Sequence, residues 1–345
     1  MNEFVQAPEQ DVVISSRVRL ARNYEDIPFS AKQTREQSDR IVARAQESLA
    51  AAGQLENYAL LRMSEMAEDA RSSLVEHHLV SYDLLKFASR AAALISSGKT
   101  VSIMLNEEDH VRIQGLLPGM QLERAAQLAL DTDDLLGAEY PYAFDPQWGF
   151  LTSCPTNTGT GMRASVMLHL PGLARSGQMA AVMQAVAKLG LTVRGIYGEG
   201  TEGKGNLYQL SNQVTLGRSE EDVVRTLAAA AQQMVENERS AREQLEKRDL
   251  LALQDRLLRS WGELTNAKLM SSREFMRRYS DVRFAASMGY LPIAQGELDQ
   301  LMMDMQPGTL AARAGKLLSE REGEILRAEQ LREELPKLLR EDVEA

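Results

Sequence analysis

The sequence predicts an α+β half followed by a helical half, with the change near Gly217. Between Asp11 and Gly217, short β-rich runs alternate with amphipathic helical stretches. After Gly217, apolar residues follow helical spacing and turn signals are few. The chain has 345 residues and 44% hydrophobic content, which is enough for the cores of two or three domains.

The first half contains both types of element. Six β-rich segments are predicted as strands, at residues 12–20, 100–106, 149–154, 164–170, 191–197 and 206–212. Three segments carry apolar residues at helical spacing, namely Thr34 to Ala52, Gln121 to Leu136 and Leu173 to Leu189. Such helices would cover one face of a sheet, so we expect one broad sheet backed by helices.

The second half is predicted to be almost entirely helical. Ser219 followed by Asp222 resembles a capping box, and helical periodicity continues from Val223. The spacing of glycine and proline beyond this point predicts four to six helices. The charged segment 237–249 is expected to be a solvated face.

Composition and charge exclude several classes of protein. The formal net charge of −10 argues against nucleic acid and anionic membranes as partners. No run of about eighteen apolar residues occurs and the N-terminus lacks signal-peptide features, so a cytoplasmic location is expected. One cysteine and four histidines leave no intramolecular disulfide and no Cys/His zinc site.

Two segments place charged residues on or beside strands. In SSRVRLAR, Arg17 and Arg19 project from one face of an extended strand, where two guanidinium groups suit a polyphosphate. In NEEDHVR, polar and acidic residues, including Glu108, follow a buried strand and Arg112 ends the segment. The alternatives are an exposed strand face for the first segment and a solvated turn for the second.

Two loops add further candidate residues. CPTNTGTGMR runs from Cys154 to Arg163, and its backbone amides would cradle an anion beside a lone thiol. VRGIYGEGTEGKGN places Arg194 at a strand end and Glu199 in a glycine-rich segment that suits a mobile lid. The alternatives are a buried structural cysteine and a flexible hairpin turn. Together the five arginines and the two glutamates suggest a site for both an anion and a cation.

These four segments resemble, in order and spacing, the ATP:guanidino phosphotransferase family. Over about Asp11 to Gly217, the resemblance implies a large, mostly antiparallel sheet flanked by helices, with a catalytic domain at 1–217 and a helical domain at 218–345. It implies that ATP phosphates are clamped by Arg17, Arg19, Arg112, Arg163 and Arg194. It further implies that Glu108 acts as the base, that Glu199 orients the guanidinium and that Cys154 lies beside it. Mg²⁺ would be held mainly by phosphates and water, so no protein metal ligand is expected.

Within this family, the chain resembles the protein arginine kinases. Phosphagen kinases carry a helical domain before the SSRVR strand, whereas only fourteen residues precede Ser15 here and helices follow Gly217. The resemblance implies protein substrates with exposed arginines, marked for a Clp-type protease, a zinc-binding activator protein, and a homodimer formed by the C-terminal helices, which also recognise phosphoarginine. Two departures are Met167, where phosphagen kinases place a histidine, and Gly323, where the phosphoarginine-sensing pattern has an arginine.

Two other functions remain open. A phosphagen kinase acting on free arginine would share most of these residues, and the missing N-terminal domain argues against it. A catalytically inactive phosphoarginine-binding adaptor would not need Glu108, Cys154 and Glu199, all of which are present.

Overall fold

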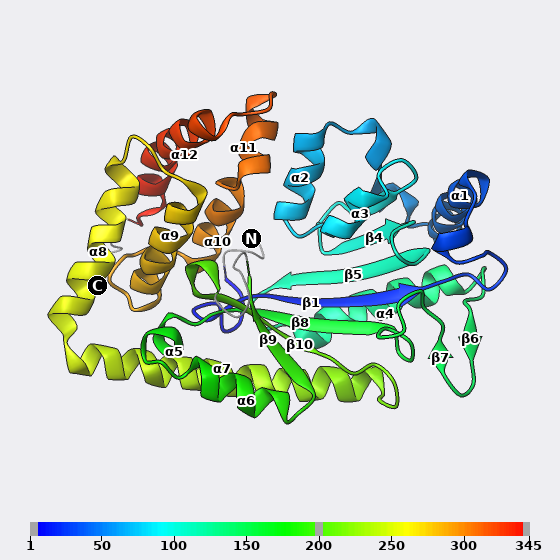
Figure 1. Cartoon of the computed structure of the whole chain (residues 1–345), viewed down its shortest axis with the longest axis horizontal. Helices are drawn as coiled ribbons and strands as arrows, with labels where there is room; N and C mark the ends of the chain where they lie inside the picture. Colours follow the sequence, from blue (N-terminus) through cyan, green and yellow to red (C-terminus); the bar gives the residue numbers. More distant parts are fainter. Residues whose placement is uncertain (1–5, 197–202, 341–345) are drawn as a thin grey trace.

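The computed structural model describes residues 6–196 and 203–340. Its centre is an eight-stranded sheet in the order β2-β3-β4-β5-β1-β8-β10-β9, in which every neighbouring pair is antiparallel (Figure 1). This confirms the predicted α+β class with a large antiparallel sheet. The strands are β1 Val13–Arg22, β2 Tyr58–Arg62, β3 Ala92–Ser96, β4 Val101–Leu105, β5 Val111–Pro118, β8 Met162–His169, β9 Leu191–Gly195 and β10 Leu207–Asn212.

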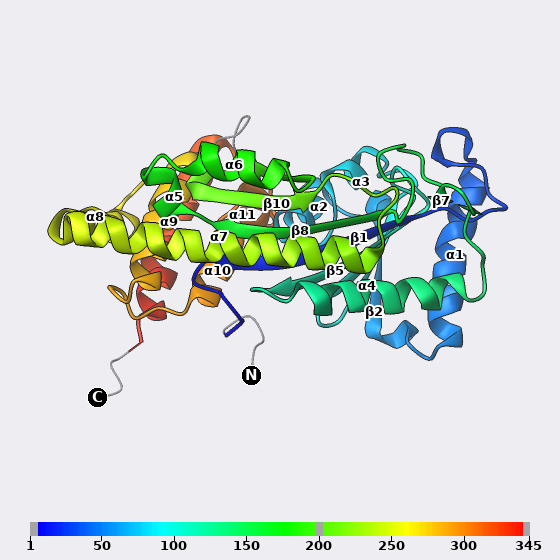
Figure 2. The ribbon, with the colours of Figure 1, turned by 90° about the horizontal axis from the view of Figure 1, so that it is seen from below.

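Three long helices cover one face of this sheet. They are α1 Arg35–Ala51, α4 Leu122–Gly137 and α7 Glu220–Arg248, and Figure 2 shows α4 and α7 running along the underside. Val18 and Leu20 of β1 point to this side and join the core with Leu227 of α7. Gly115 of β5 allows the closest approach, because a Cβ there would lie 2.2 Å from the Ala125 carbonyl oxygen of α4.

Within residues 6–196 and 203–340, helices cover the opposite face at two places. At the β3–β4 end, helices α2 Glu68–Glu76 and α3 Tyr82–Lys86 enclose a small core with Ala93 and Met104. At the other end, the C-terminal helices pack on Ile14, Met167 and Leu207 of the sheet. Strands β5, β1 and β8 lie between these two blocks (Figure 1), and they carry Arg112, Arg17, Arg19 and Arg163 of the candidate site.

The C-terminal region is helical, as predicted, and it also touches α2. The α2 carboxylate of Glu76 accepts hydrogen bonds from the backbone amides of Gly308 (2.8 Å) and Thr309 (2.6 Å). This contact joins the two blocks on the site's side of the sheet. The helices are α8 Leu250–Asn266, α9 Ser272–Ser287, α10 Gln295–Asp304, α11 Pro307–Ala314 and α12 Glu320–Glu334.

Shorter elements complete the described part of the chain. Strands β6 Phe144–Asp145 and β7 Gly149–Phe150 form a separate hairpin, and helices α5 Pro171–Arg175 and α6 Met179–Ala187 follow β8. No helix in the described ranges is long and apolar enough to cross a membrane. The 3₁₀ turns are Ser30–Lys32, Leu55–Asn57, Met63–Glu65, Lys204–Asn206 and Leu335–Leu338.

Several expected elements differ from the structure. Strands β2, β3 and β5 were not predicted, and β3 is almost uniformly buried, so the alternation that marks a half-exposed strand is absent. The segment 149–154 contributes only the two residues of β7. The helix expected over 173–189 is two helices, because Gly177 has a φ of +71° and ends the first.

The expectation of a solvated face at 237–249 is wrong for the inner side of α7. Glu238 and Arg242 are buried, with 0% and 3% of their surfaces exposed. Glu238 accepts hydrogen bonds from the Gly172 and Leu173 amides at the start of α5 and from Arg242 Nε. Burial of this pair is tolerated because each charged group has partners. The apolar side chains of α7 lie in the core beneath the sheet.

Candidate active site

The strand register brings all five predicted arginines to the same face of the sheet. Arg17 and Arg19 lie two residues apart on β1, and Arg19 is directly opposite Arg163 of β8. Arg112 lies on β5 on the other side of β1, where it pairs with Ala21. Burial lowers the pKa of Arg19, and the charges of Arg17, Arg112 and Arg163 lower it further. Like charges at this density favour the binding of a polyanion.

Hydrogen bonds hold these guanidinium groups in place. Arg17 Nη2 donates to Gln209 Oε1 of β10 at 2.8 Å. Arg163 Nη1 donates to the Asn212 carbonyl at 3.0 Å, and its Nη2 donates to the Thr156 carbonyl at 2.9 Å. The acceptors are neutral, so the Arg163 contacts fix its orientation without neutralising its charge.

Arg112 has a charged partner that sequence reasoning missed. Its Nη1 lies 2.8 and 2.9 Å from the two carboxylate oxygens of Glu107, which is 1% exposed. Ser81 Oγ donates to the same carboxylate at 2.6 Å. Glu107 directly precedes the predicted base in NEEDHVR, and nothing in the sequence distinguishes a buried ion-pair residue from an exposed one at adjacent positions.

The side chain of Glu108 is exposed, and it is close enough to Arg112 for that charge to act on its carboxyl group. Partial burial raises the pKa of its carboxyl group, and the nearby charge of Asp109 raises it further. Asp109 is buried and accepts hydrogen bonds from Asn23 Nδ2 and from the Ser153 amide, both at 2.7 Å. Because Ser153 precedes Cys154, Asp109 ties the turn that carries Glu108 to the cysteine loop.

The loop from Cys154 to Gly161 is fixed against strand β1. Gly161 has a φ of +65°, and a Cβ at this position would lie 2.6 Å from the Ala21 carbonyl oxygen, so only glycine fits without displacement. The Cys154 thiol is partly buried and lies 3.1 Å from Thr156 Oγ1. Burial lowers the pKa of Arg163, and the charge of Cys154 opposes this, so the two side chains are electrostatic neighbours.

The two remaining predicted residues are Arg194, which lies on strand β9, and Glu199. Arg194 lies on β9 opposite Gln209, with its side chain exposed. Its charge contributes to lowering the pKa of Arg163, so it belongs to the same electrostatic field. Glu199 lies outside the described residues.

The opposite end of the arginine row is marked by a small hollow beside Arg17. Met167 and His78 line this hollow. Burial lowers the pKa of His78 to about 3, with a further contribution from Arg17, so this imidazole is neutral near pH 7. The arginine-bearing face of β1 and β8 is therefore uncharged at Met167. Arg17 and then the pair Arg19 and Arg163 follow along the strands, and Cys154 lies beyond this pair.

Two models of known protein families match this chain. The model of the ATP:guanido phosphotransferase C-terminal catalytic domain matches residues 40–241, and that of the protein-arginine kinase McsB C-terminal domain matches residues 250–345. The chain belongs to the ATP:guanido phosphotransferase family. Within this family it groups with the protein-arginine kinases through its C-terminal helices.

Curated relatives in the family match almost the whole chain. The protein-arginine kinase of Caldanaerobacter subterraneus subsp. tengcongensis is 43% identical over 331 residues, which cover 95% of this chain and 98% of the relative. The protein-arginine kinase of Geobacillus sp. (strain WCH70) is 44% identical over 336 residues, covering 96% of this chain and 92% of the relative.

Solved structures of guanidino kinases share the fold. The duplicated taurocyamine kinase of Schistosoma mansoni with transition state analogue components superposes with a TM-score of 0.58 at 29% identity, covering 66% of this chain. The match spans 33% of that longer chain. A lombricine kinase superposes with a TM-score of 0.57 at 24% identity, covering 67% of each chain, which supports the fold alone.

Proposed function

We propose that the chain is a protein arginine kinase, which transfers the γ-phosphoryl group of ATP to the guanidinium group of arginine side chains in other proteins. The observation that carries the proposal is the row of guanidinium groups from Arg17 to Arg163 that ends beside Cys154 and Glu108. A row of cations next to a carboxylate suits the reaction of an anionic donor with a cationic acceptor.

The arginines would bind and orient the triphosphate. Arg17, Arg19, Arg112 and Arg163 supply fixed positive charge along one line of the sheet, and Arg194 adds charge from β9. Phosphoryl transfer needs in-line positioning and neutralisation of the phosphate oxygens, with little covalent help from the protein. The hydrogen bonds to Arg17 and Arg163 preorganise this cradle before ATP binds.

Glu108 would accept the proton that the acceptor nitrogen loses. A guanidinium nitrogen becomes nucleophilic only as its proton leaves, so a carboxylate within reach is required. The nitrogen then forms a bond to the γ-phosphorus while the bond from phosphorus to the β–γ bridging oxygen breaks, and ADP leaves. We assign Cys154 to hold the guanidinium as a thiolate partner and Glu199 to orient it.

Mg²⁺ fits this site as a companion of ATP and not as a resident of the protein. The described ranges contain no group of three or more His, Cys, Asp or Glu side chains placed to hold a metal ion. Phosphate oxygens and water are the ligands that Mg²⁺ prefers, and the arginine row would receive a triphosphate. When bound, Mg²⁺ would neutralise charge on the phosphate oxygens.

The C-terminal helices would serve regulation and assembly. We assign residues 1–217 together with α7 to catalysis, because α7 packs in the core beneath the sheet, and the following helices to dimerisation and phosphoarginine recognition. Phosphoarginine recognition would differ from the usual pattern at Arg327. This residue is 3% exposed and donates hydrogen bonds to the Met305 and Met270 carbonyl oxygens. A zinc-binding activator, a Clp-type protease and a cytoplasmic location complete the proposal.

A competition assay tests the choice of acceptor. The chain is incubated with ATP, Mg²⁺ and equal concentrations of free arginine and of arginine within an unstructured protein. We expect phosphorylation of the protein to dominate, with no phosphoarginine accumulating from the free amino acid. Preferential labelling of free arginine would instead identify a phosphagen kinase. Nucleotide binding without transfer to either acceptor, even with an activator present, would favour the adaptor.

A further inference from the structure

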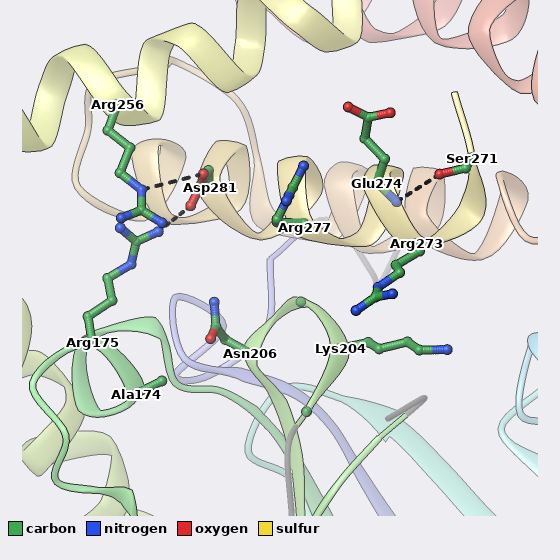
Figure 3. A pocket seen from close by; sticks show the side chains of 12 residues that line it. Ala174, Arg175, Lys204, Asn206, Arg256, Ser271, Arg273, Glu274, Arg277 and Asp281 are labelled. Atoms are coloured by element: carbon green, nitrogen blue, oxygen red, sulfur yellow. Dashed lines mark hydrogen bonds and ion pairs between the residues drawn. The ribbon is translucent and has the colours of Figure 1, made fainter. Parts of the chain in front are cut away.

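A second charged cavity lies between the C-terminal helices and the end of the sheet. Its volume is about 990 Å³, and its walls come from helices α5, α8 and α9 and from the turn before β10 (Figure 3). None of the residues that line it belongs to the arginine row. The volume lies at the upper end of the range for small-molecule sites.

Positive charge dominates the lining of this cavity. Five cations line it, against the two carboxylates of Glu274 and Asp281, and these cations are Arg175, Lys204, Arg256, Arg273 and Arg277. Arg175 and Arg256 both approach Asp281, with Arg256 Nε 4.0 Å from its carboxylate (Figure 3). Asp281 also accepts a hydrogen bond from Ser260 Oγ at 2.9 Å, so its charge is already shared.

Three cations remain available to a ligand. Lys204, Arg273 and Arg277 are exposed and make no ion pair with another residue in the described ranges. Arg273 and Arg277 lie four residues apart on α9 and therefore share a face of that helix. Figure 3 shows Arg273 reaching toward Lys204, which comes from the turn before β10. Groups from two separate elements thus converge on one space.

The turn that carries Lys204 is held firmly against α9. Gly205 has a φ of +66°, and a Cβ there would lie 2.6 Å from the Met276 carbonyl oxygen of α9. Asn206 Nδ2 donates to Ser280 Oγ, also on α9, at 2.8 Å. Lys204 and Arg273 are therefore set side by side by the fold, which lowers the cost of ordering them around an anion.

The lining also indicates the class of ligand. Among the described residues that line the cavity, none is aromatic, and Ala174 is the one with an aliphatic side chain. A nucleobase would find no stacking surface, whereas guanidinium groups bind phosphate oxygens through paired hydrogen bonds. From these observations, we propose that the cavity binds a small, multiply phosphorylated anion at a site separate from that of ATP.

Calorimetric titration with inorganic tripolyphosphate tests this site. The full chain carries Arg19→Ala, which weakens phosphate binding at the arginine row. We expect one tripolyphosphate to bind per chain, and at least tenfold weaker binding after the further substitutions Lys204→Ala, Arg273→Ala and Arg277→Ala. The matched control replaces three exposed residues, Lys188, Arg248 and Lys268, by alanine, which removes the same number of charges outside the cavity, and should leave the affinity unchanged.

The outcomes separate the proposal from its alternatives. Equal affinity with and without the triple substitution, or no binding at all, would overturn it. Binding of a doubly phosphorylated peptide but not of tripolyphosphate, lost in the triple variant, would overturn the small-anion assignment in favour of a protein ligand. Because the three side chains are exposed, the thermal midpoint should not change and will report any misfolding. The titration measures binding and does not require kinase activity. Its result can therefore be interpreted even if the chain proves not to be a protein arginine kinase.

Discussion

Glu107 and Glu108 are adjacent in sequence but have opposite surroundings. Glu107 is buried and paired with Arg112, whereas Glu108 is exposed. The turn between β4 and β5 produces this difference, because Asn106 adopts a φ of +62° and its side chain is held by Ser38 and Gln33. Glu107 is therefore paired with the arginine row, whereas Glu108, the proposed base, is exposed.

We predict separate effects for substitutions of these two residues. Glu107→Gln leaves Arg112 without a charged partner beside Arg19, and should lower the free energy of unfolding by about 3 kcal/mol. Glu108→Gln should leave stability nearly unchanged and reduce phosphoryl transfer by at least a hundredfold. Urea unfolding and initial-rate assays measure the two quantities. Equal stability of both variants would contradict the assignment of Glu107.

The raised pKa of Glu108 predicts an acidic limit to activity. Partial burial, Asp109, Glu107 and Asp83 all raise this pKa above its ordinary value of about 4.5. If ionised Glu108 is the base, the rate falls as pH drops through the raised pKa. Asp83→Asn removes a negative charge, so the pKa should fall and the acidic limb should move to lower pH. The exposed Glu65→Gln serves as the control, and a limb that stays in place for Asp83→Asn would count against this role.

The sequence predicted which residues form the candidate site, but it did not predict the hydrogen-bond partners of those residues. Order and spacing indicated Arg17, Arg19, Arg112, Arg163 and Arg194, and the strand register places these five on one face. The partners of the arginines, such as Gln209 for Arg17, depend on which strands are neighbours. That information is tertiary, and no local pattern contains it. The roles assigned to the site residues stay predictions.

The start of helix α7 was predicted from the sequence, but the burial of its charged residues was not. The Ser219 cap and the periodicity after it correctly predicted where the helix begins, since Ser219 Oγ accepts a hydrogen bond from the Asp222 amide. The charged stretch at its end suggested solvent, but Glu238 and Arg242 face the interior. The residue type alone does not distinguish a buried, paired charged side chain from a solvated one.

A matched pair of substitutions on α7 distinguishes the two situations. Glu238→Ala would leave the Gly172 and Leu173 amides without an acceptor in the interior and would remove the carboxylate that pairs with Arg242. We therefore expect a loss of about 3 to 5 kcal/mol in the free energy of unfolding. Glu243→Ala, on the solvent side of the same helix, should change it by less than about 0.5 kcal/mol. Similar small losses for both would show that the Glu238 network contributes little.

The whole molecule is a sheet with helices beneath it and two helical blocks above its ends. These blocks meet where α11 packs on α2, at the contacts of Glu76. His77, which directly follows α2, lies with its Nε2 3.5 Å from the carboxylate of Asp304 of α10 in the same region. The C-terminal helices are thereby linked to the catalytic sheet at two places, the sheet end and α2.

The His77 contact predicts a pH-dependent contribution to stability. The Asp304 hydrogen bond raises the pKa of His77 above its ordinary value of 6.5. A raised folded-state pKa stabilises the fold below the unfolded-state pKa, and this contribution is lost as pH rises through the folded-state value. The difference in unfolding free energy between wild type and His77→Gln should therefore be largest near pH 6 and shrink toward pH 9. A difference that does not vary with pH would exclude an ionic role for His77.

The proposed reaction forms a phosphorus–nitrogen bond on arginine side chains, and the acid lability of that bond makes the product detectable. Radiolabelled γ-phosphate from ATP is followed into an arginine-containing protein such as casein, with wild type and Glu108→Gln compared in parallel. We predict label on the protein that is lost in acid and retained in alkali, as expected for a phosphorus–nitrogen bond to arginine, and no label with the variant. Label that survives acid, or equal labelling by the variant, would contradict the account.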